Sequence, residues 1–335
     1  MSSKPKEPKA EKPQKEPKPK KEKPAVYRFY GGTRYETALK AAEEFREQLG
    51  TDKLSSVIIA CGTNYADALS GSYLSSVRKA PILLTDTKKD HIDLVRNYIN
   101  DHVKKGGTVY LLGGPAVVPD SVKTGLGDFV VTRLWGADRY ETNMAVLKEA
   151  GIASEDILVC SGMNFPDSLS AAAAGSPIIL VKNEIQSFQK EYLQDLTGKK
   201  IYIIGGEGAV NEKIFSSFEA FGTVERIGGT DRYETSALFA DKFFDNCEGA
   251  VLAYGKDFPD GLCGGALANI KGVPLLLTAE GKNDAARSFI AKKAGQFIDD
   301  GGKIKADILG GPALISDENA LTAFGIEKVG KVVVK

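Results

Sequence analysis

The chain has few of the residues on which catalytic and metal sites most often rely. Its 335 residues include two histidines and four cysteines. His91 and His102 belong to no HExxH pattern and are expected at the surface, whereas Cys61, Cys160 and Cys263 lie in or beside apolar segments and are expected in the core. Since a hydrolase requires a nucleophile with a base, or a metal with its ligands, we predict no enzyme activity, no metal and no cofactor.

Long apolar segments are also lacking. No run reaches the ~18 residues that a membrane span requires, and nothing near Met1 resembles the apolar core of a signal peptide. Residues 1–24 instead hold nine Lys, six Pro and four Glu, a composition that predicts a disordered, extended linker. Because the chain begins inside such a linker, we expect it to be a fragment of a longer exported protein.

Neither sign of charge is in excess, since 44 basic residues balance 44 acidic ones. Nine lysines against four glutamates give residues 1–24 a charge of +5, which leaves −5 for the remainder. A general polyanion-binding protein would have a basic folded surface. Nucleic acid is therefore not expected as a partner.

What the sequence does contain is a threefold internal repeat. Four blocks recur in one order: a Gly-rich turn ending in Arg-Tyr-Glu-Thr, a loop ending in an aspartate before a small residue and leucine, an apolar segment that begins with proline, and an apolar residue followed by Gly-Gly. They stand at residues 31–37, 136–142 and 228–235; 62–69, 162–169 and 255–262; 81–85, 177–181 and 274–278; and 112–114, 204–206 and 309–311. The repeated arginines are 105 and 93 residues apart, a period too long for a solenoid. We predict three domains, at residues 25–129, 130–222 and 223–335.

Within each copy, short apolar strands alternate with helical patterns. In the first copy, strands are expected at residues 26–30, 56–60, 82–84 and 108–112, and a helix begins near Tyr35 with an apolar stripe at helical spacing. Because the strands are continuous apolar runs, helices should cover both faces of the sheet, as in a parallel sheet. The sequence thus predicts an α/β fold of three tandem Rossmann-like modules.

The turns that follow these strands carry the candidate binding residues. In an open parallel sheet a ligand binds beyond the carboxyl ends of the strands, and a helix that begins behind a Gly-rich turn suits a phosphate, sulfate or carboxylate. Arg34, Arg139 and Arg232 would add charge-assisted contacts to such an anion. Alternatively, each arginine braces its turn against an aspartate of the second block. The polar candidates of that block are Asn64, Asn164, Asp257, Asp67, Asp167 and Asp260.

The glutamates and tyrosines of the first block are expected to have structural roles. Glu36, Glu141 and Glu234 lie in the first turn of a helix, where a carboxylate complements the helix dipole. The tyrosines are expected to pack in the core and not to serve as platforms for sugars. They are Tyr35, Tyr140 and Tyr233.

Together, Asp-Arg-Tyr-Glu-Thr, Asn-Phe-Pro-Asp-Ser-Leu, Pro-Ile-Leu-Leu and Leu-Gly-Gly resemble the cell-wall-binding type 2 repeats of Gram-positive surface and S-layer-associated proteins. The similarity spans about residues 25–330. It implies a secreted monomer of three modules with pseudo-threefold symmetry, which anchors a surface protein non-covalently to an anionic, teichoic-acid-like secondary polymer of the cell wall. It also associates the apolar third block with anchoring, although such a run first predicts a buried strand. Those residues are Ile82, Leu83, Leu84, Ile178, Ile179, Leu180, Leu275, Leu276 and Leu277.

Three hypotheses about function follow from these features. The first is a wall anchor, because three weak sites on a repetitive polymer gain avidity, whereas a catalytic domain gains nothing of this kind from triplication. The second is the accessory part of a cell-wall hydrolase, an amidase or a protease, whose catalytic domain is not in this chain. The third is a structural or adhesive surface protein whose modules mediate assembly.

Overall fold

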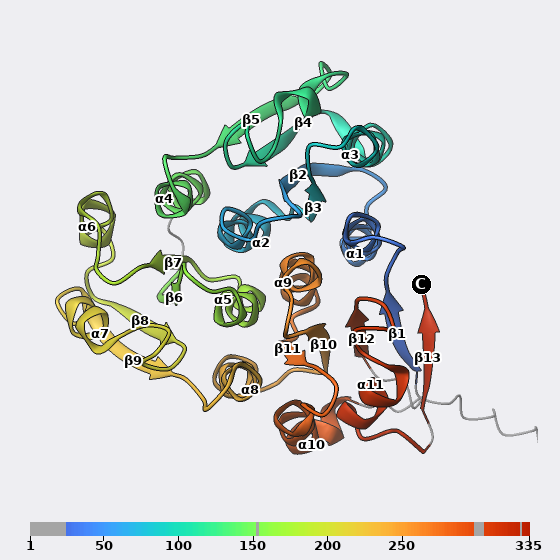
Figure 1. Ribbon diagram of the computed structural model, residues 1–335, viewed down its shortest axis with the longest axis vertical. Coiled ribbons are helices and arrows are strands. Elements are labelled where there is room, and N and C mark those ends of the chain that lie inside the picture. The colour runs from blue at the N-terminus through green and yellow to red at the C-terminus, as the bar shows by residue number, and fades with distance from the viewer. Residues whose placement is uncertain (1–24, 152–153, 298–304, 329) are drawn as a thin grey trace, which may run out of the picture.

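The structure is a computed structural model that describes residues 25–151, 154–297, 305–328 and 330–335. The predicted linker at residues 1–24 lies outside them. The described strands form three sheets in which every strand pair is parallel, and these sheets with their helices surround a common centre with pseudo-threefold symmetry (Figure 1). The predicted α/β fold of three Rossmann-like modules is confirmed.

The first sheet has the strand order β3-β2-β4-β5. Its strands are β2 (Leu54–Cys61), β3 (Ile82–Thr85), β4 (Val103–Leu112) and β5 (Val130–Leu134). The helices of this copy are α1 (Arg34–Gln48), α2 (Gly71–Arg78) and α3 (Lys89–His102), with 3₁₀ turns η1 (Ala68–Ser70) and η2 (Asp120–Lys123). Apolar residues of β2, β3 and β4 pack against α3 in one buried cluster, as continuous apolar strands require.

The second sheet repeats this order as β7-β6-β8-β9. Its strands are β6 (Asp156–Ser161), β7 (Ile178–Val181), β8 (Lys199–Ile204) and β9 (Gly222–Ile227). The helices are α4 (Arg139–Ala150), α5 (Pro166–Ala171), α6 (Ser187–Gln194) and α7 (Glu212–Phe218), with η3 (Ala172–Ala174) after α5.

The third sheet has five strands in the order β11-β10-β12-β1-β13. They are β1 (Ala25–Phe29), β10 (Gly249–Tyr254), β11 (Leu275–Thr278), β12 (Lys305–Leu309) and β13 (Lys331–Val334). The helices are α8 (Arg232–Phe243), α9 (Pro259–Lys271), α10 (Asp284–Phe297) and α11 (Asp317–Ala323). None of the described helices is long and apolar enough to cross a membrane.

Each repeat of the sequence begins with a strand that pairs in the sheet of another copy. β5 and β9 begin the second and third repeats, yet β5 pairs with β4 of the first sheet and β9 with β8 of the second. β1, which begins the first repeat, lies between β12 and β13 of the third sheet. The helices that follow these strands, α1, α4 and α8, pack on β3, β7 and β11 of the next sheet. The chain therefore closes into a ring in which each copy is completed by its neighbour.

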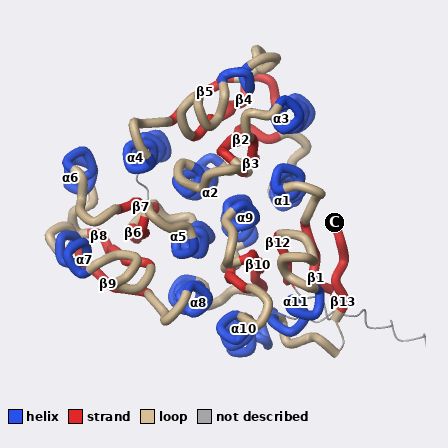
Figure 2. Tube along the Cα trace, viewed as in Figure 1, coloured by secondary structure: helices blue, strands red, loops and turns tan. Residues whose placement is uncertain are grey.

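Helices α2, α5 and α9 meet at the centre of the ring (Figure 2). Small residues allow their close approach: a Cβ added at Gly261 would lie 2.6 Å from Leu169, and one added at Gly265 would collide with Ala172. Because these contacts join α9 to α5 and η3, the small-residue helices connect one copy to the next.

A buried ion-pair cluster joins the first copy to the third. Lys271, at the end of α9, contacts Glu44 of α1 at 2.7 Å and also Asp307 of β12, and the three side chains are only 15%, 9% and 6% exposed. Burial opposes the charge on Lys271, but its two carboxylate partners outweigh burial and raise its pKa. Burial raises the pKa of Asp307, with Lys271 acting against the shift. The cluster lies where the ring closes.

Candidate functional site

The turns that begin α1, α4 and α8 are called here the head turns, residues 31–34, 136–139 and 229–232. In the second copy, Asp138 accepts the N–H groups of residues 140 and 141, while Glu141 and Thr142 accept those of residues 137 and 136 at 2.8 and 3.1 Å. The same capping pattern holds for Thr33, Glu36 and Thr37, and for Asp231, Glu234 and Thr235. The glutamates thus cap the helices as predicted. These N–H groups, which we expected an anion to use, are already bonded within the turn.

The head arginines, Arg34, Arg139 and Arg232, lie half-buried at the end of each head turn. Each donates from Nη1 to the carbonyl of the glycine that follows the strand of its own copy. The distances are 2.8 Å from Arg34 to Gly62, 2.6 Å from Arg139 to Gly162 and 2.7 Å from Arg232 to Gly255. Each arginine therefore braces a loop, as in the second alternative of the sequence analysis, but through a carbonyl and not through an aspartate.

The guanidinium groups also reach the loops of a neighbouring copy. Each lies over an aromatic ring there: Arg34 over Phe258 at 5.7 Å, Arg139 over Tyr65 at 5.4 Å and Arg232 over Phe165 at 5.5 Å. The three rings contact one another, with centroids 5.5, 5.5 and 6.0 Å apart. The head arginines are thus positioned by an aromatic cluster to which all three copies contribute.

The predicted aspartates end the segments named the Asp loops, residues 64–67, 164–167 and 257–260, and Asp167 and Asp260 already lie in the first turn of α5 and α9. Asp167 packs against Gly205, where an added Cβ would lie 2.5 Å from its Oδ2 and where the backbone φ is +110°. Only glycine suits that conformation and that space, which explains the first glycine of each Gly-Gly loop, residues 113–114, 205–206 and 310–311. Asp67 and Asp260 stand in the same way against Gly113 and Gly310.

Burial perturbs all three aspartates. It raises the pKa of Asp167 and of Asp260 to about 6, although Arg232 and Arg34 respectively oppose the shift. Burial raises the pKa of Asp67 as well, against the opposing effects of the Thr142 hydroxyl and Arg139. Each aspartate therefore faces the head arginine of another copy, so that two copies supply the charges of one site.

Two grooves between copies contain these charges. The groove between the second and third copies, about 320 Å³, is lined by Asn164, Asp167, Gly206, Arg232 and Thr235, among others. The groove between the third and first copies, about 300 Å³, is lined by the corresponding Arg34, Thr37, Asp257, Asp260 and Gly311. The Asp loop and Gly-Gly loop of one copy thus face the head turn of the next.

The polar residues that begin the Asp loops first shape their own backbone. The side-chain oxygens of Asn64, Asn164 and Asp257 each accept a backbone N–H one or two residues later at 2.9 Å. Asp257 also lies 3.7 Å from Arg34, whereas asparagine occupies this position in the other two copies. The head arginine of the first copy is therefore partly neutralised.

The nine apolar residues predicted from the third block are all buried. They form β3, β7 and β11, and none is more than 2% exposed. The tyrosines of the first block are buried too; for example, Tyr35 fills the space where a Cβ of Gly62 would lie, 2.6 Å from the ring. These residues pack beneath the loops and do not line the grooves.

The sequence motifs did not single out a second set of repeated arginines. Arg28, Arg133 and Arg226 donate to the carbonyls of Gly310, Gly113 and Gly205, at 2.7, 2.6 and 3.1 Å. Each holds the glycine against which an aspartate packs. The signal was available, because each stands six residues before a head arginine.

His91, expected at the surface, is packed between elements of the first copy. Its ring stacks on Tyr35 with centroids 3.8 Å apart, and its Nδ1 lies 2.9 Å from Asp86. Tyr35 also donates its hydroxyl proton to Asp86 at 2.7 Å. These contacts fill the space between α1 and α3.

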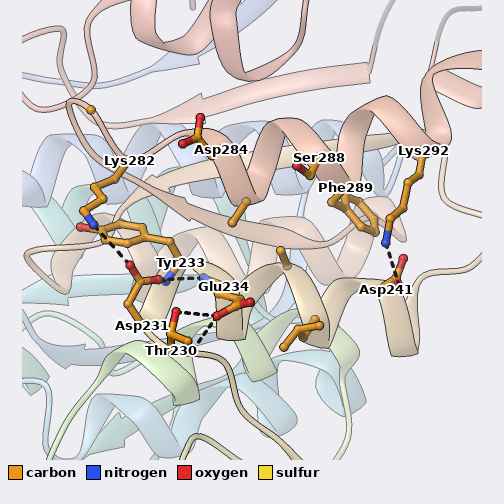
Figure 3. A pocket seen from close by; sticks show the side chains of 14 residues that line it. Thr230, Asp231, Tyr233, Glu234, Asp241, Lys282, Asp284, Ser288, Phe289 and Lys292 are labelled. Atoms are coloured by element: carbon orange, nitrogen blue, oxygen red, sulfur yellow. Dashed lines mark hydrogen bonds and ion pairs between the residues drawn. The ribbon is translucent and has the colours of Figure 1, made fainter.

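The corresponding space between α8 and α10 in the third copy is an open cavity of about 430 Å³ (Figure 3). Lys282 lies 3.5 Å from Asp231 at one end, and Lys292 lies 3.3 Å from Asp241 at the other. The cavity is lined by residues of the third copy alone, whereas each groove is shared between two copies.

Comparison with known families identifies the repeat. A family model described as cell wall binding domain 2 (CWB2) matches residues 28–123, 133–215 and 226–320. Among curated proteins of Bacillus subtilis, the N-acetylmuramoyl-L-alanine amidase LytC is 26% identical over 277 residues, which cover 80% of this chain and 53% of the relative. The amidase enhancer is 28% identical over 293 residues, which cover 84% and 39%. The chain thus spans about half or less of these relatives.

Two solved structures share the fold. Cwp8 of Clostridium difficile matches with a TM-score of 0.75 at 21% identity, over 91% of this chain and 52% of the other. Cwp6 of the same organism matches with a TM-score of 0.74 at 22% identity, over 92% and 48%. The family model, which matches each of the three copies, confirms the motif resemblance noted in the sequence.

Proposed function

The chain belongs to the cell wall binding domain 2 family, and from that premise we propose that the grooves between its copies hold an anionic, teichoic-acid-like polymer of the cell wall. In this proposal the chain anchors a surface protein non-covalently, outside the cell. Its folded part carries no catalysis and acts as a monomer whose three copies bind one polymer at several points.

The observation that carries the proposal is the repeated head arginine at each junction between copies. One Nη1 is committed to a backbone carbonyl, while the side chain of Arg34 is still 36% exposed beside its groove. A guanidinium fixed in this way has its remaining donors pre-oriented, so that little side-chain entropy is lost when an anion binds. Three such sites at fixed positions favour a repetitive anionic chain over a small anion.

The buried apolar strands have a supporting role in this proposal. Since β3, β7 and β11 lie beneath the loops, substitutions there would weaken binding by loosening the loops and not by removing a contact with sugar. The predicted ligand residues of the third block are accordingly assigned to the core.

A pull-down on purified cell-wall polymer tests the proposal. We expect retention at low salt that weakens as salt increases, because exposed charge contacts are screened. A chain that the polymer does not retain at low salt would contradict an anchoring role.

A second candidate is the accessory part of a wall hydrolase, which the two curated relatives favour. Both relatives are longer than the matched region, and one is an amidase. In that case the wall-binding module brings to the wall a catalytic domain that this chain does not contain. Release of peptidoglycan fragments by this chain alone would instead require a catalytic site within it.

Retention should increase as the pH falls from 7 to 5. Asp167 and Asp260 have pKa values raised to about 6 beside Arg232 and Arg34, so that acid removes one negative charge from each of two grooves. A phosphodiester polymer stays ionised over this range.

Since the pKa values of Asp167 and Asp260 are raised by folding, the free energy of unfolding should also increase as the pH falls through 6 toward about 4.

The double variant Asp167→Asn with Asp260→Asn mimics the protonated state. At pH 7 it should be retained nearly as the unmodified chain is at pH 5, and most of the pH dependence of its retention should be lost, with Asp67 beside Arg139 left to titrate. A steep dependence that survives in this variant would show that other groups are responsible.

Asp257→Asn should strengthen binding of the polymer at the groove between the third and first copies. It removes the carboxylate 3.7 Å from Arg34 and restores the asparagine found in the other copies. Because both side chains are partly exposed, the expected gain is about threefold, below ~1 kcal/mol. Affinity is best measured with Arg139 and Arg232 both replaced by alanine, so that this groove is isolated. Asp284→Asn makes the same change of charge at an exposed position outside the grooves, and equal gains in the two variants would refute a local effect.

A further inference from the structure

Trp135 is the one tryptophan of the chain, and it is exposed. Its side chain is 55% accessible, and among the described residues it is the only aromatic one in the set of exposed large hydrophobic side chains. An indole left in water forfeits the burial of a large apolar surface. Exposed aromatic residues beside polar groups are typical of binding sites.

The position of Trp135 places it at the junction between the first and second copies. It follows β5 and directly precedes the head turn that carries Arg139. The indole packs on Gly114, where an added Cβ would lie 3.2 Å from its Cε3. Gly206 and Gly311, which correspond to Gly114, line the other two grooves. The indole therefore forms part of the third junction, beside the pair of Asp67 and Arg139.

The other two copies differ at this position. Tyr30 takes the place of Trp135 beside Gly311, with an added Cβ 3.4 Å from its ring, and is half-buried. Gly228 takes that place in the remaining groove, where a Cβ would lie 2.7 Å from the backbone of both Gly205 and Gly206. No side chain fits there, so one junction lacks an aromatic ring at this position while the other two have one.

We propose that Trp135 is a stacking platform for a sugar ring of the bound polymer, and that Tyr30 is a weaker one. This inference rests on the proposed function, because it divides recognition of one polymer between two side chains. Arg139 binds the anionic group, and the indole packs against the apolar C–H face of the adjacent sugar. The groove at Gly228 contacts only the anionic group. The three junctions thus share one charge contact and differ in their contact with the sugar.

A single tryptophan makes the platform directly observable. Short fragments of purified wall polymer should shift the emission of Trp135 to the blue and protect it from quenching by acrylamide. Binding that leaves emission and quenching unchanged would overturn this inference while leaving the proposed function intact. A chain that binds no polymer at all would overturn both.

Substitutions separate stacking from a structural role. Trp135→Ala should weaken binding of the fragments about fivefold to tenfold, whereas Trp135→Phe should retain most of the affinity. Val130→Ala, at an equally exposed residue of β5, the strand that Trp135 follows, is the matched control and should have no effect. Equal affinities of the Ala and Phe variants would overturn the platform.

The second platform is tested by moving the indole. In a chain with Trp135→Phe, the change Tyr30→Trp places the sole tryptophan at the groove between the third and first copies. Its emission should also shift when polymer fragments are added. An unresponsive indole at this position would restrict stacking to Trp135 and overturn the role of Tyr30.

Discussion

Replacing Arg34, Arg139 and Arg232 together by alanine should abolish retention of the chain on wall polymer. Each head arginine offers charge-assisted contacts, which contribute about 1.5–3 kcal/mol apiece. Because the three junctions would engage one polymer, their losses also remove avidity, itself on the order of 10² to 10⁴. The expected loss of affinity is therefore about 10³-fold or more, measured by retention on immobilised polymer or by surface plasmon resonance.

A charge-matched variant controls for the loss of three positive charges. Lys89, Lys105 and Lys305 have exposed side chains outside the grooves, and their replacement by alanine should reduce retention only slightly. Because each head arginine also braces a loop, circular dichroism and thermal unfolding must show that the triple variant is folded. A folded triple variant that is still retained would favour the assembly hypothesis, in which the polymer is incidental.

The substitution Lys271→Met should destabilise the protein by about 3–5 kcal/mol, the typical cost of leaving a buried charge without its partner. Glu44 and Asp307 would then face each other in the interior without the ammonium group that lies between them. Because this cluster joins α9 and β12 of the third copy to α1 of the first, the loss should open the ring where it closes. Urea unfolding at pH 8 measures the effect.

The destabilisation by Lys271→Met should be smaller at pH 5. Without the lysine, a buried carboxyl group has a folded-state pKa well above its unfolded value, so the penalty is relieved as the pH falls and a proton is bound. Lys292→Met breaks the exposed pair with Asp241 and should cost less than about 1 kcal/mol. Equal effects of the two substitutions would contradict the role assigned to the buried cluster.

The sequence was sufficient to predict the three copies, their parallel sheets and the capping of the head turns. These features depend on local pattern: continuous apolar strands, a capping residue before Arg-Tyr-Glu-Thr, and the same spacing in each copy. Glu141, for instance, accepts a backbone N–H of its own turn, a contact that its position four residues after Ala137 allows.

The sharing of sites between copies could not be predicted from those patterns. It depends on where β1, β5 and β9 pair, and strand order in a parallel sheet is not encoded in any local signal. The repeat begins with a strand that belongs to another sheet, so that the head turn behind it faces the Asp loop of another copy. Arg232 therefore faces Asp167 and not Asp260, which follows it in the same repeat.

Other features were missed because their partners are distant in sequence. Arg28 is buried and bonds to Gly310, 282 residues away, so that a strand arginine gives no local indication of its role. The packing of His91 on Tyr35 likewise depends on how α3 lies against α1. The exposed Trp135 gave no repeat signal, because the equivalent positions of the other two copies hold Tyr30 and Gly228.

Arginine NMR signals can locate the bound polymer, because the chain has only ten arginines. The Nε–Hε signals would be assigned by substitution and followed while fragments of wall polymer are added. If the polymer lies between the copies, the signals of Arg34, Arg139 and Arg232 should shift together, while those of Arg46, Arg96 and Arg287 stay in place. Binding that shifts the latter and leaves the head arginines unchanged would contradict the claim that the polymer lies between the copies.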